Sequence, residues 1–358
     1  MTFKESFHAL MNFEKPDLLV QFEWGYWDET IERWQKEGLP QEKQPWEHLN
    51  ITTYERVPVK RRFDPDFERK VLEEDEENQI IQDENGIIQK ISRKRTVFPQ
   101  FLKHPVQNRE DFEKIRKRLN PYSKGRYPSD WKERIEDLQK RDTILVLGQC
   151  DISFFGWPRE LMGLKNLLMS FYDQPELIKA INDYHLWFLK ELYDKALNEV
   201  KFDCAFIWED MAYKNGPLIS PELFREFILP YYKDLTSYLR NRGIKWIILD
   251  SDGNFEKLIP LFREGGINGL LPFECAAGLD IGAIRQAYPD LRILGGIDKR
   301  EIANGKDAID KELEEKLPFM FSKGGYIPTL DHHVPPEISY EDFKYYLEKT
   351  REIYGSVN

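Results

Sequence analysis

Between Arg141 and the C-terminus, short apolar runs alternate with longer amphipathic stretches, and this rhythm restricts the possible folds more than any other feature of the sequence. Short β-branched and aromatic runs indicate strands, whereas apolar residues that recur every three or four positions indicate helices. Regular alternation of the two is typical of a parallel sheet with helices packed outside it. The predicted strands are 144–147, 204–207, 246–249, 269–272, 292–294 and 326–329. The predicted helices include 175–199, 221–242, 255–264, 281–288 and 306–321.

The N-terminal third, residues 1–125, differs from this pattern. Residues 1–12 have helical spacing of apolar side chains, and the run at 18–22 is strand-like. Two alternating runs, 79–82 and 87–91, flank the sequence Asp-Glu-Asn-Gly, which suits a tight hairpin turn. With one or two N-terminal strands, the later strands approach the eight of a closed barrel.

We therefore predict an α/β protein with a (β/α)8 TIM-type barrel, formed by a single domain over residues 1–358. Residues 1–125 would supply an N-terminal helical and β-hairpin elaboration and the first barrel elements. An open, doubly wound sheet would show the same alternation. No Gly-x-Gly-x-x-Gly turn follows an early strand, so a dinucleotide-binding fold has no positive support.

Net charge and cysteine content limit the kinds of ligand and the cellular compartment that we expect for this protein. A formal net charge of -11 opposes binding to nucleic acid or to anionic lipid, which favours a small-molecule substrate. The three cysteines, Cys150, Cys204 and Cys275, are far apart and do not resemble a disulfide framework. The N-terminus has no signal-peptide pattern, and no apolar run approaches membrane-spanning length. We expect a cytoplasmic protein.

Polar residues gather at the predicted strand ends, which is where barrel enzymes carry their chemistry. They are Glu209 and Asp210, Asp250 and Asp252, Glu274, Asp298, and the adjacent His332 and His333. For catalysis we single out Glu209 or Asp210, of which only one can face the site, together with Asp252 and His332. Glu274, Asp298 and His333 are candidates for binding a substrate or cofactor.

Asp250 and Asp252 stand two positions apart, so an extended chain points both carboxylates to one side. With Glu274 and His332 they could form a divalent metal site of oxygen and nitrogen ligands, for which zinc is one candidate. The alternative is that Asp252-Gly253-Asn254 is simply a turn that caps the next helix.

Aromatic residues around Trp157 follow Cys150 and Asp151 and could line a pocket for a flat, bulky ligand. Core packing explains the same aromatics equally well. Cys275 is a weaker candidate, because a lone cysteine beside an acid is more often a small buried residue.

From Arg141 to the C-terminus the sequence resembles the uroporphyrinogen decarboxylase superfamily, and the N-terminal part resembles it loosely. The superfamily also contains cobalamin-dependent methyltransferases. The motifs that carry the resemblance are Glu209-Asp210, the stretches 216–224 and 229–233, Asp252-Gly253-Asn254, and Gly295-Gly296-Ile297-Asp298.

Two branches of the superfamily imply different reactions. The decarboxylase branch holds a polycarboxylate with an Arg-rich N-terminal segment, and no such segment precedes Lys60. In that branch's late motif, His332 takes the place of the substrate-site histidine. Methyltransferases with thiol acceptors carry a His-x-Cys zinc pair where this chain has Asp250 and Asp252, which favours a harder metal or none.

The resemblance therefore implies methyl transfer between a corrinoid (cobalamin) carrier and a small molecule. A uroporphyrinogen decarboxylase, which is a carboxy-lyase of tetrapyrrole biosynthesis, is the alternative. A non-catalytic corrinoid or tetrapyrrole binder is the third possibility. The expected partners are a small-molecule substrate, a corrinoid protein and a second copy of the chain in a homodimer, and no nucleic acid or membrane.

Overall fold

A curled parallel sheet forms the centre of the protein in the computed structural model, which describes residues 1–94, 99–149 and 152–357. Its strands follow the order β1 (Tyr54–Arg56), β6 (Ile144–Gln149), β7 (Cys204–Trp208), β10 (Trp246–Asp250), β11 (Gly269–Leu271), β12 (Arg292–Leu294) and β13 (Tyr326–Ile327). Every neighbouring pair is parallel. The α/β class and the six predicted strands after Arg141 are thereby confirmed, and the curled sheet is compatible with the predicted barrel.

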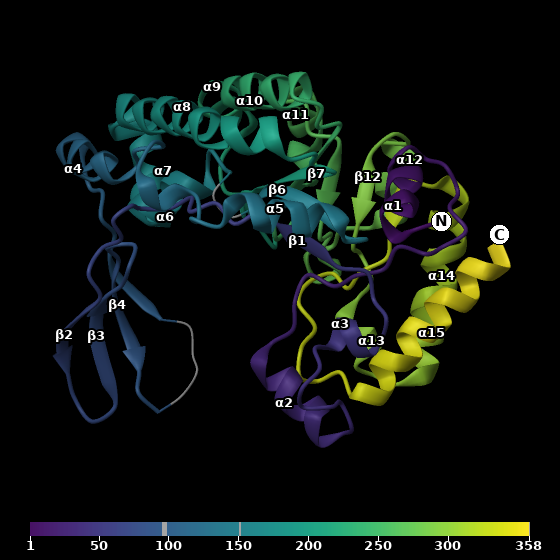
Figure 1. Ribbon diagram of the computed structural model, residues 1–358. Helices are drawn as coiled ribbons and strands as arrows, with labels where there is room; N and C mark the ends of the chain where they lie inside the picture. Colours follow the sequence, from purple (N-terminus) through teal and green to yellow (C-terminus); the bar gives the residue numbers. More distant parts are fainter. Residues whose placement is uncertain (95–98, 150–151, 358) are drawn as a thin grey trace.

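Helices cover the outside of this sheet, as the alternation predicts. Along one side lie α4 (Arg109–Ile115), α5 (Trp131–Lys140), α6 (Gly156–Met162), α7 (Leu164–Asp173), α8 (Pro175–Glu199), α9 (Pro221–Phe227), α10 (Leu229–Asn241) and α11 (Ile259–Glu264) (Figure 1). The other side carries α1 (Phe3–Met11), α2 (Asp28–Lys36), α3 (Pro45–His48), α12 (Ile281–Ala287), α13 (Lys299–Ile302), α14 (Lys306–Lys323) and α15 (Tyr340–Val357). One cluster of buried apolar side chains extends from Phe7 to Tyr354. Among the described residues, no helix has the length and apolar character needed to cross a bilayer.

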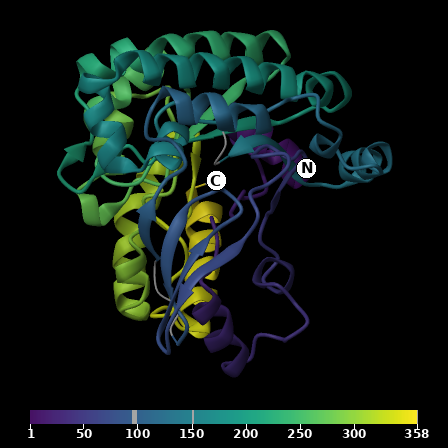
Figure 2. The same ribbon diagram turned by 90° about the vertical axis from the view of Figure 1, so that its left-hand side faces the viewer.

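The predicted hairpin is half of a larger antiparallel sheet. That sheet consists of β2 (Lys70–Glu74), β3 (Asn78–Gln82), β4 (Ile88–Ser92) and β5 (Gln100–Lys103). The predicted turn at Asp83 joins β3 to β4, where the Asp83 carboxylate accepts hydrogen bonds from the backbone of Asn85 and Ile87. The sheet extends away from the layer of α8 and α10 in both views (Figure 1, Figure 2).

The predicted strand at 18–22 is wrong as a regular strand, although the chain there is extended. Thr52, just before β1, donates its backbone N–H to the Gln21 carbonyl at 2.9 Å, and Tyr26, just after the segment, forms an isolated bridge with Val334. The segment therefore lies between the two edges of the sheet, next to the chain before β1 and to the chain after β13. None of the backbone hydrogen bonds in the described residues joins 18–22 to β1 itself, so no ladder forms.

Two predicted helices are divided in the structure. The helix predicted over 221–242 breaks at Ile228 between α9 and α10. Pro230 explains the break, because its ring supplies no N–H and clashes with the carbonyl four residues earlier. The helix predicted over 255–264 begins as a 3-10 turn, Glu256–Leu258, and becomes α11 only at Ile259.

Candidate functional site

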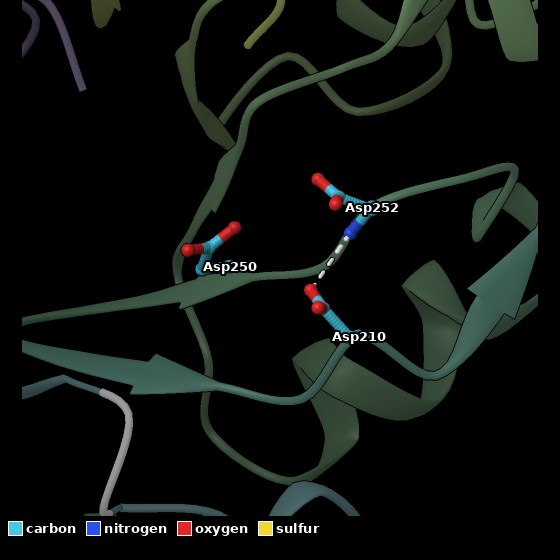
Figure 3. Close-up of side chains that lie close together, drawn as sticks. All are labelled: Asp210, Asp250 and Asp252. Carbon is cyan, nitrogen blue, oxygen red and sulfur yellow. Dashed lines mark hydrogen bonds between the residues drawn. The ribbon is translucent and has the colours of Figure 1, made fainter. Parts of the chain in front are cut away.

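Three aspartates meet at the C-terminal ends of β7 and β10. The two strands pair in parallel with Asp250 opposite Trp208, so the residues that follow each strand emerge at the same edge. One carboxylate oxygen from each of Asp210, Asp250 and Asp252 lies within 4.8 Å of the others (Figure 3). The separation of Asp250 and Asp252 by two positions places both on one side, as the strand geometry predicts.

Local backbone geometry turns Asp210 into this cluster. Asp210 has φ 44°, a left-handed conformation that Asp tolerates better than most residues. The Asp252 backbone N–H then donates to Asp210 Oδ1 at 3.4 Å, the dashed contact in Figure 3. Gly253 allows the two loops to lie this close, because a Cβ at that position would approach the Ala212 carbonyl carbon to 2.7 Å.

Burial and mutual repulsion perturb the acids of the cluster. The pKa of Asp210 is raised to about 6, chiefly by burial and then by the charge of Asp252. The pKa of Asp250 is raised well above its usual range by burial, and further by the charges of Asp210, Asp252 and Glu274. No hydrogen bond to the Asp250 carboxylate is present among the described residues. A bound cation would relieve this repulsion.

Glu274 and His332 border the cluster from the next strands. Glu274 follows β11, and its Oε2 accepts the Gly253 backbone N–H at 2.8 Å. His332 follows β13, and its Nε2 lies 3.6 Å from Asp252 Oδ2. The contact with Asp252 raises the pKa of His332, although burial opposes the shift. Of the predicted metal set, Asp250 and Asp252 lie in the cluster with Asp210, whereas Glu274 and His332 contact its edge and do not belong to it.

A cavity of about 500 Å³ opens onto these acids. Asp210, Asp252 and Glu274 contribute its acidic part, and Arg159 and Lys214 are the basic residues of its lining. The remainder is largely apolar, with Leu164, Tyr213 and Leu218 among its side chains. Such a combination of apolar walls and convergent polar groups is typical of small-molecule sites.

Glu209 points away from its neighbour Asp210 and anchors another element. Its fully buried carboxylate accepts the backbone N–H groups of Phe154, Phe155 and Gly156, each at 2.8 Å, and the Tyr232 hydroxyl. Burial raises the pKa of Glu209 to about 7, while these four donors lower it. Only Asp210 of the pair reaches the cluster, and Glu209 holds the start of α6.

Three other predicted residues lie outside the cluster. Trp157 is buried in the core, where its ring stacks on His185 at 5.0 Å. Asp298 caps α13 through the Arg300 backbone N–H and pairs with the Arg300 guanidinium. His333 packs over Gly25, and burial lowers its pKa.

The structure also bears on the alternative that Asp252-Gly253-Asn254 is a capping turn, and on the candidate Cys275. Asn254, not Asp252, caps the turn before α11, because its Oδ1 accepts the Glu256 backbone N–H at 3.2 Å. Cys275 lies 3.5 Å from the Lys316 ammonium, yet burial raises its pKa to about 12, so it is a thiol. Cys150 and Asp151 lie outside the described residues.

Sequence reasoning missed three residues around the site. Arg159 of α6 donates to the Asp210 carbonyl at 2.8 Å, and its Nη1 lies 3.9 Å from the Asp210 carboxylate. Trp27 stacks on His332 with ring centroids 6.5 Å apart. Buried Asp331 accepts the Cys275 backbone N–H and the Lys299 ammonium, which fixes the loop that carries His332. Of the three, only Asp331 follows a predicted strand, so its position in the sequence could have marked it as a site residue.

The family model and one solved structure agree with this architecture. The sequence model of the family described as uroporphyrinogen decarboxylase (URO-D) matches residues 84–353. A methyltransferase from Methanosarcina mazei shares the fold, with a TM-score of 0.64, 15% sequence identity and 99% coverage of both chains. A protein from Listeria monocytogenes described as a vitamin-B12-independent methionine synthase matches with a TM-score of 0.34 and 14% identity, over 62% of this chain and 66% of that one. A search among curated proteins gave no match.

Proposed function

The chain belongs to the uroporphyrinogen decarboxylase family, and from this premise we propose that it is an enzyme that transfers a methyl group between a corrinoid carrier and a small molecule. The fold shared with the Methanosarcina mazei methyltransferase over 99% of both chains supports methyl transfer over the family's other reaction. The observation that carries the proposal is the cluster of Asp210, Asp250 and Asp252 beside His332, at the mouth where barrel enzymes react.

A divalent metal fits the residues of this cluster. Three carboxylates within 4.8 Å of one another, with no donor to the Asp250 carboxylate among the described residues, are an unfavourable arrangement without a cation. Carboxylate oxygens suit a harder ion than the thiolate set of thiol-activating zinc sites does. Asp210, Asp250 and Asp252 would hold the ion, with Glu274 and His332 at its margin. When bound, it would act as a Lewis acid on the polar group of the small molecule.

His332 and Asp252 suit the proton transfer that methylation of a protic acceptor requires. An acceptor that takes a methyl group loses a proton, and His332 Nε2 is placed at the site to take it. Asp252, 3.6 Å away, favours the resulting imidazolium. The cavity offers apolar side chains for contact with the small molecule beside these groups, and Trp27 orients the imidazole ring by stacking.

The alternative reaction, decarboxylation of uroporphyrinogen, finds less support in this geometry. A polycarboxylate substrate requires several cations, whereas the described lining of the cavity offers Arg159 and Lys214 against Asp210, Asp252 and Glu274. A non-catalytic tetrapyrrole binder gains no support from a costly acidic cluster at the mouth. We therefore propose methyl transfer alone.

Metal analysis tests the cluster directly. Protein purified without chelator is expected to carry a divalent ion at close to one equivalent by plasma mass spectrometry, and an Asp252→Ala, His332→Ala double variant is expected to lose it. Asp173→Ala, which removes an exposed acid on α7, is the matched control and should retain the ion. Metal-free wild-type protein would contradict the metal assignment.

Acid is expected to weaken metal binding. The Asp210 carboxyl has a pKa of about 6, so it takes up a proton as the pH falls through that value, and a protonated carboxyl neither binds a cation nor offsets its charge. The apparent Kd should rise by about tenfold or more for each pH unit below about 6, because the pKa of Asp250 in the same cluster is also raised. Equilibrium dialysis between pH 5 and 8 measures this, and a pH-independent Kd would contradict it.

A further inference from the structure

A second cavity lies where the sheet is not continuous, between β1 and the extended segment Phe22–Tyr26. The segment contacts the β1 side through Thr52 and Gln21, and the chain after β13 through Tyr26 and Val334. Between these two points, none of the hydrogen bonds described joins the backbones of residues 22–26 and 53–56. A space of about 620 Å³, here named the seam pocket, opens there at the edge of the sheet.

Aromatic rings form most of the apolar wall of the seam pocket. They belong to Phe22, Trp24, Tyr26, Trp46 and Tyr54. Trp24 lies 6.5 Å from Tyr54 and 6.1 Å from Phe206, centroid to centroid, so its ring crosses from the segment towards β1 and β7. Its indole N–H is buried and has no acceptor within the described part of the chain. A buried donor without a partner is costly, so a ligand that places an acceptor beside this N–H would be stabilised by it.

One cation of the pocket has no acid partner. Arg56 donates to the Tyr54 hydroxyl at 3.4 Å and lies over the Tyr54 ring at 5.6 Å, but no carboxylate within 4.0 Å pairs with it in the described ranges. Arg141, at the outer rim, is instead bound to Glu55 at 3.1 Å. The carboxylate of Glu23 is occupied by the Leu330 backbone N–H and the Tyr346 hydroxyl. The pocket thus offers an anion a cation that no acid neutralises and an N–H donor, while its two acids are already bound.

We propose that the seam pocket binds a small organic anion with a flat apolar body, such as an aromatic carboxylate. The rings supply the contact area, the Trp24 N–H and Arg56 bind the anionic end, and a charge-assisted hydrogen bond is the stronger kind of contact. The segment that forms its wall also borders the histidine pair: Gly25 backs onto His333 and Trp27 stacks on His332. This proposal concerns a separate cavity and stands whether or not the methyl-transfer proposal is correct.

Indole N–H resonances give a direct test, because the nine tryptophans each contribute one signal in protein labelled with 15N-tryptophan. A Trp24→Phe variant identifies the Trp24 signal. Benzoate is expected to shift that signal saturably, whereas benzyl alcohol, which lacks the charge, should bind at least about tenfold more weakly. Arg56→Met should weaken benzoate by a similar factor, and Arg141→Met, which removes the paired arginine of the same rim, should not.

Two outcomes would overturn the proposal. One is the absence of any shift of the Trp24 signal up to about 10 mM benzoate, a concentration well above the Kd expected of even a weak specific ligand. The other is an equal response to benzoate and benzyl alcohol, or a benzoate response that survives Arg56→Met, because either would show that the anion is not recognised. Circular dichroism of each variant separates loss of binding from loss of folding.

Discussion

An Asp250→Asn variant is expected to lose at least about 100-fold in kcat/KM for methyl transfer while its fold is retained. The Asp250 carboxylate receives no hydrogen bond from the described residues, so the amide removes charge without breaking a contact of the fold. Its pKa is raised well above the usual range by burial and by the charges of Asp210, Asp252 and Glu274. A carboxyl with so high a pKa becomes charged only when a cation or a positively charged reacting group lies beside it, so we expect its charge to serve binding.

Methylcobalamin, tested with sets of small thiols and amines as acceptors, provides the assay, and loss of the methyl–cobalt absorbance provides the signal. Asp173→Asn, an exposed aspartate on α7, is the matched control and should leave the rate unchanged. An Asp250→Asn enzyme with wild-type kcat/KM would remove Asp250 from the site. Carboxyl loss from uroporphyrinogen, with no demethylation of methylcobalamin, would replace the proposed reaction by the family's decarboxylation.

A Glu209→Ala variant is expected to lower the free energy of unfolding by about 4 kcal/mol or more, since buried donors left without an acceptor cost about 1–3 kcal/mol each. The substitution leaves three backbone N–H groups and the Tyr232 hydroxyl unsatisfied in a fully buried place. Urea denaturation followed by circular dichroism measures the change.

A Tyr232→Phe variant provides a milder comparison for Glu209→Ala. It removes one donor and leaves the carboxylate with the three backbone N–H groups, so the expected loss is only about 1 kcal/mol. Were Glu209→Ala to cost less than Tyr232→Phe, the carboxylate would not be the anchor of α6. Glu209 would then have to be reconsidered as a catalytic acid.

Several site residues were predictable because a strand end is visible in the sequence. Asp250, Asp252, Glu274 and His332 each follow an apolar run, and parallel strands bring their C-terminal ends to one edge. The choice between Glu209 and Asp210 was not predictable, because it depends on a left-handed φ at Asp210 and on the N–H groups of residues 154–156. For Trp157 the sequence allowed a pocket position and a core position equally. The structure shows the core position, where the indole stacks on the His185 ring.

The sequence by itself determined the strand–helix alternation, the family resemblance and the polar strand ends, because each of these is written in short, local stretches of residues. Only the tertiary structure decided which carboxylates meet, that Arg159 and Trp27 border the site, and that the first extended segment leaves a pocket beside β1. Those features depend on strand register, on single backbone angles and on contacts between segments as distant as Trp27 and His332. Such distant contacts form only when the whole chain packs, so no local pattern encodes them.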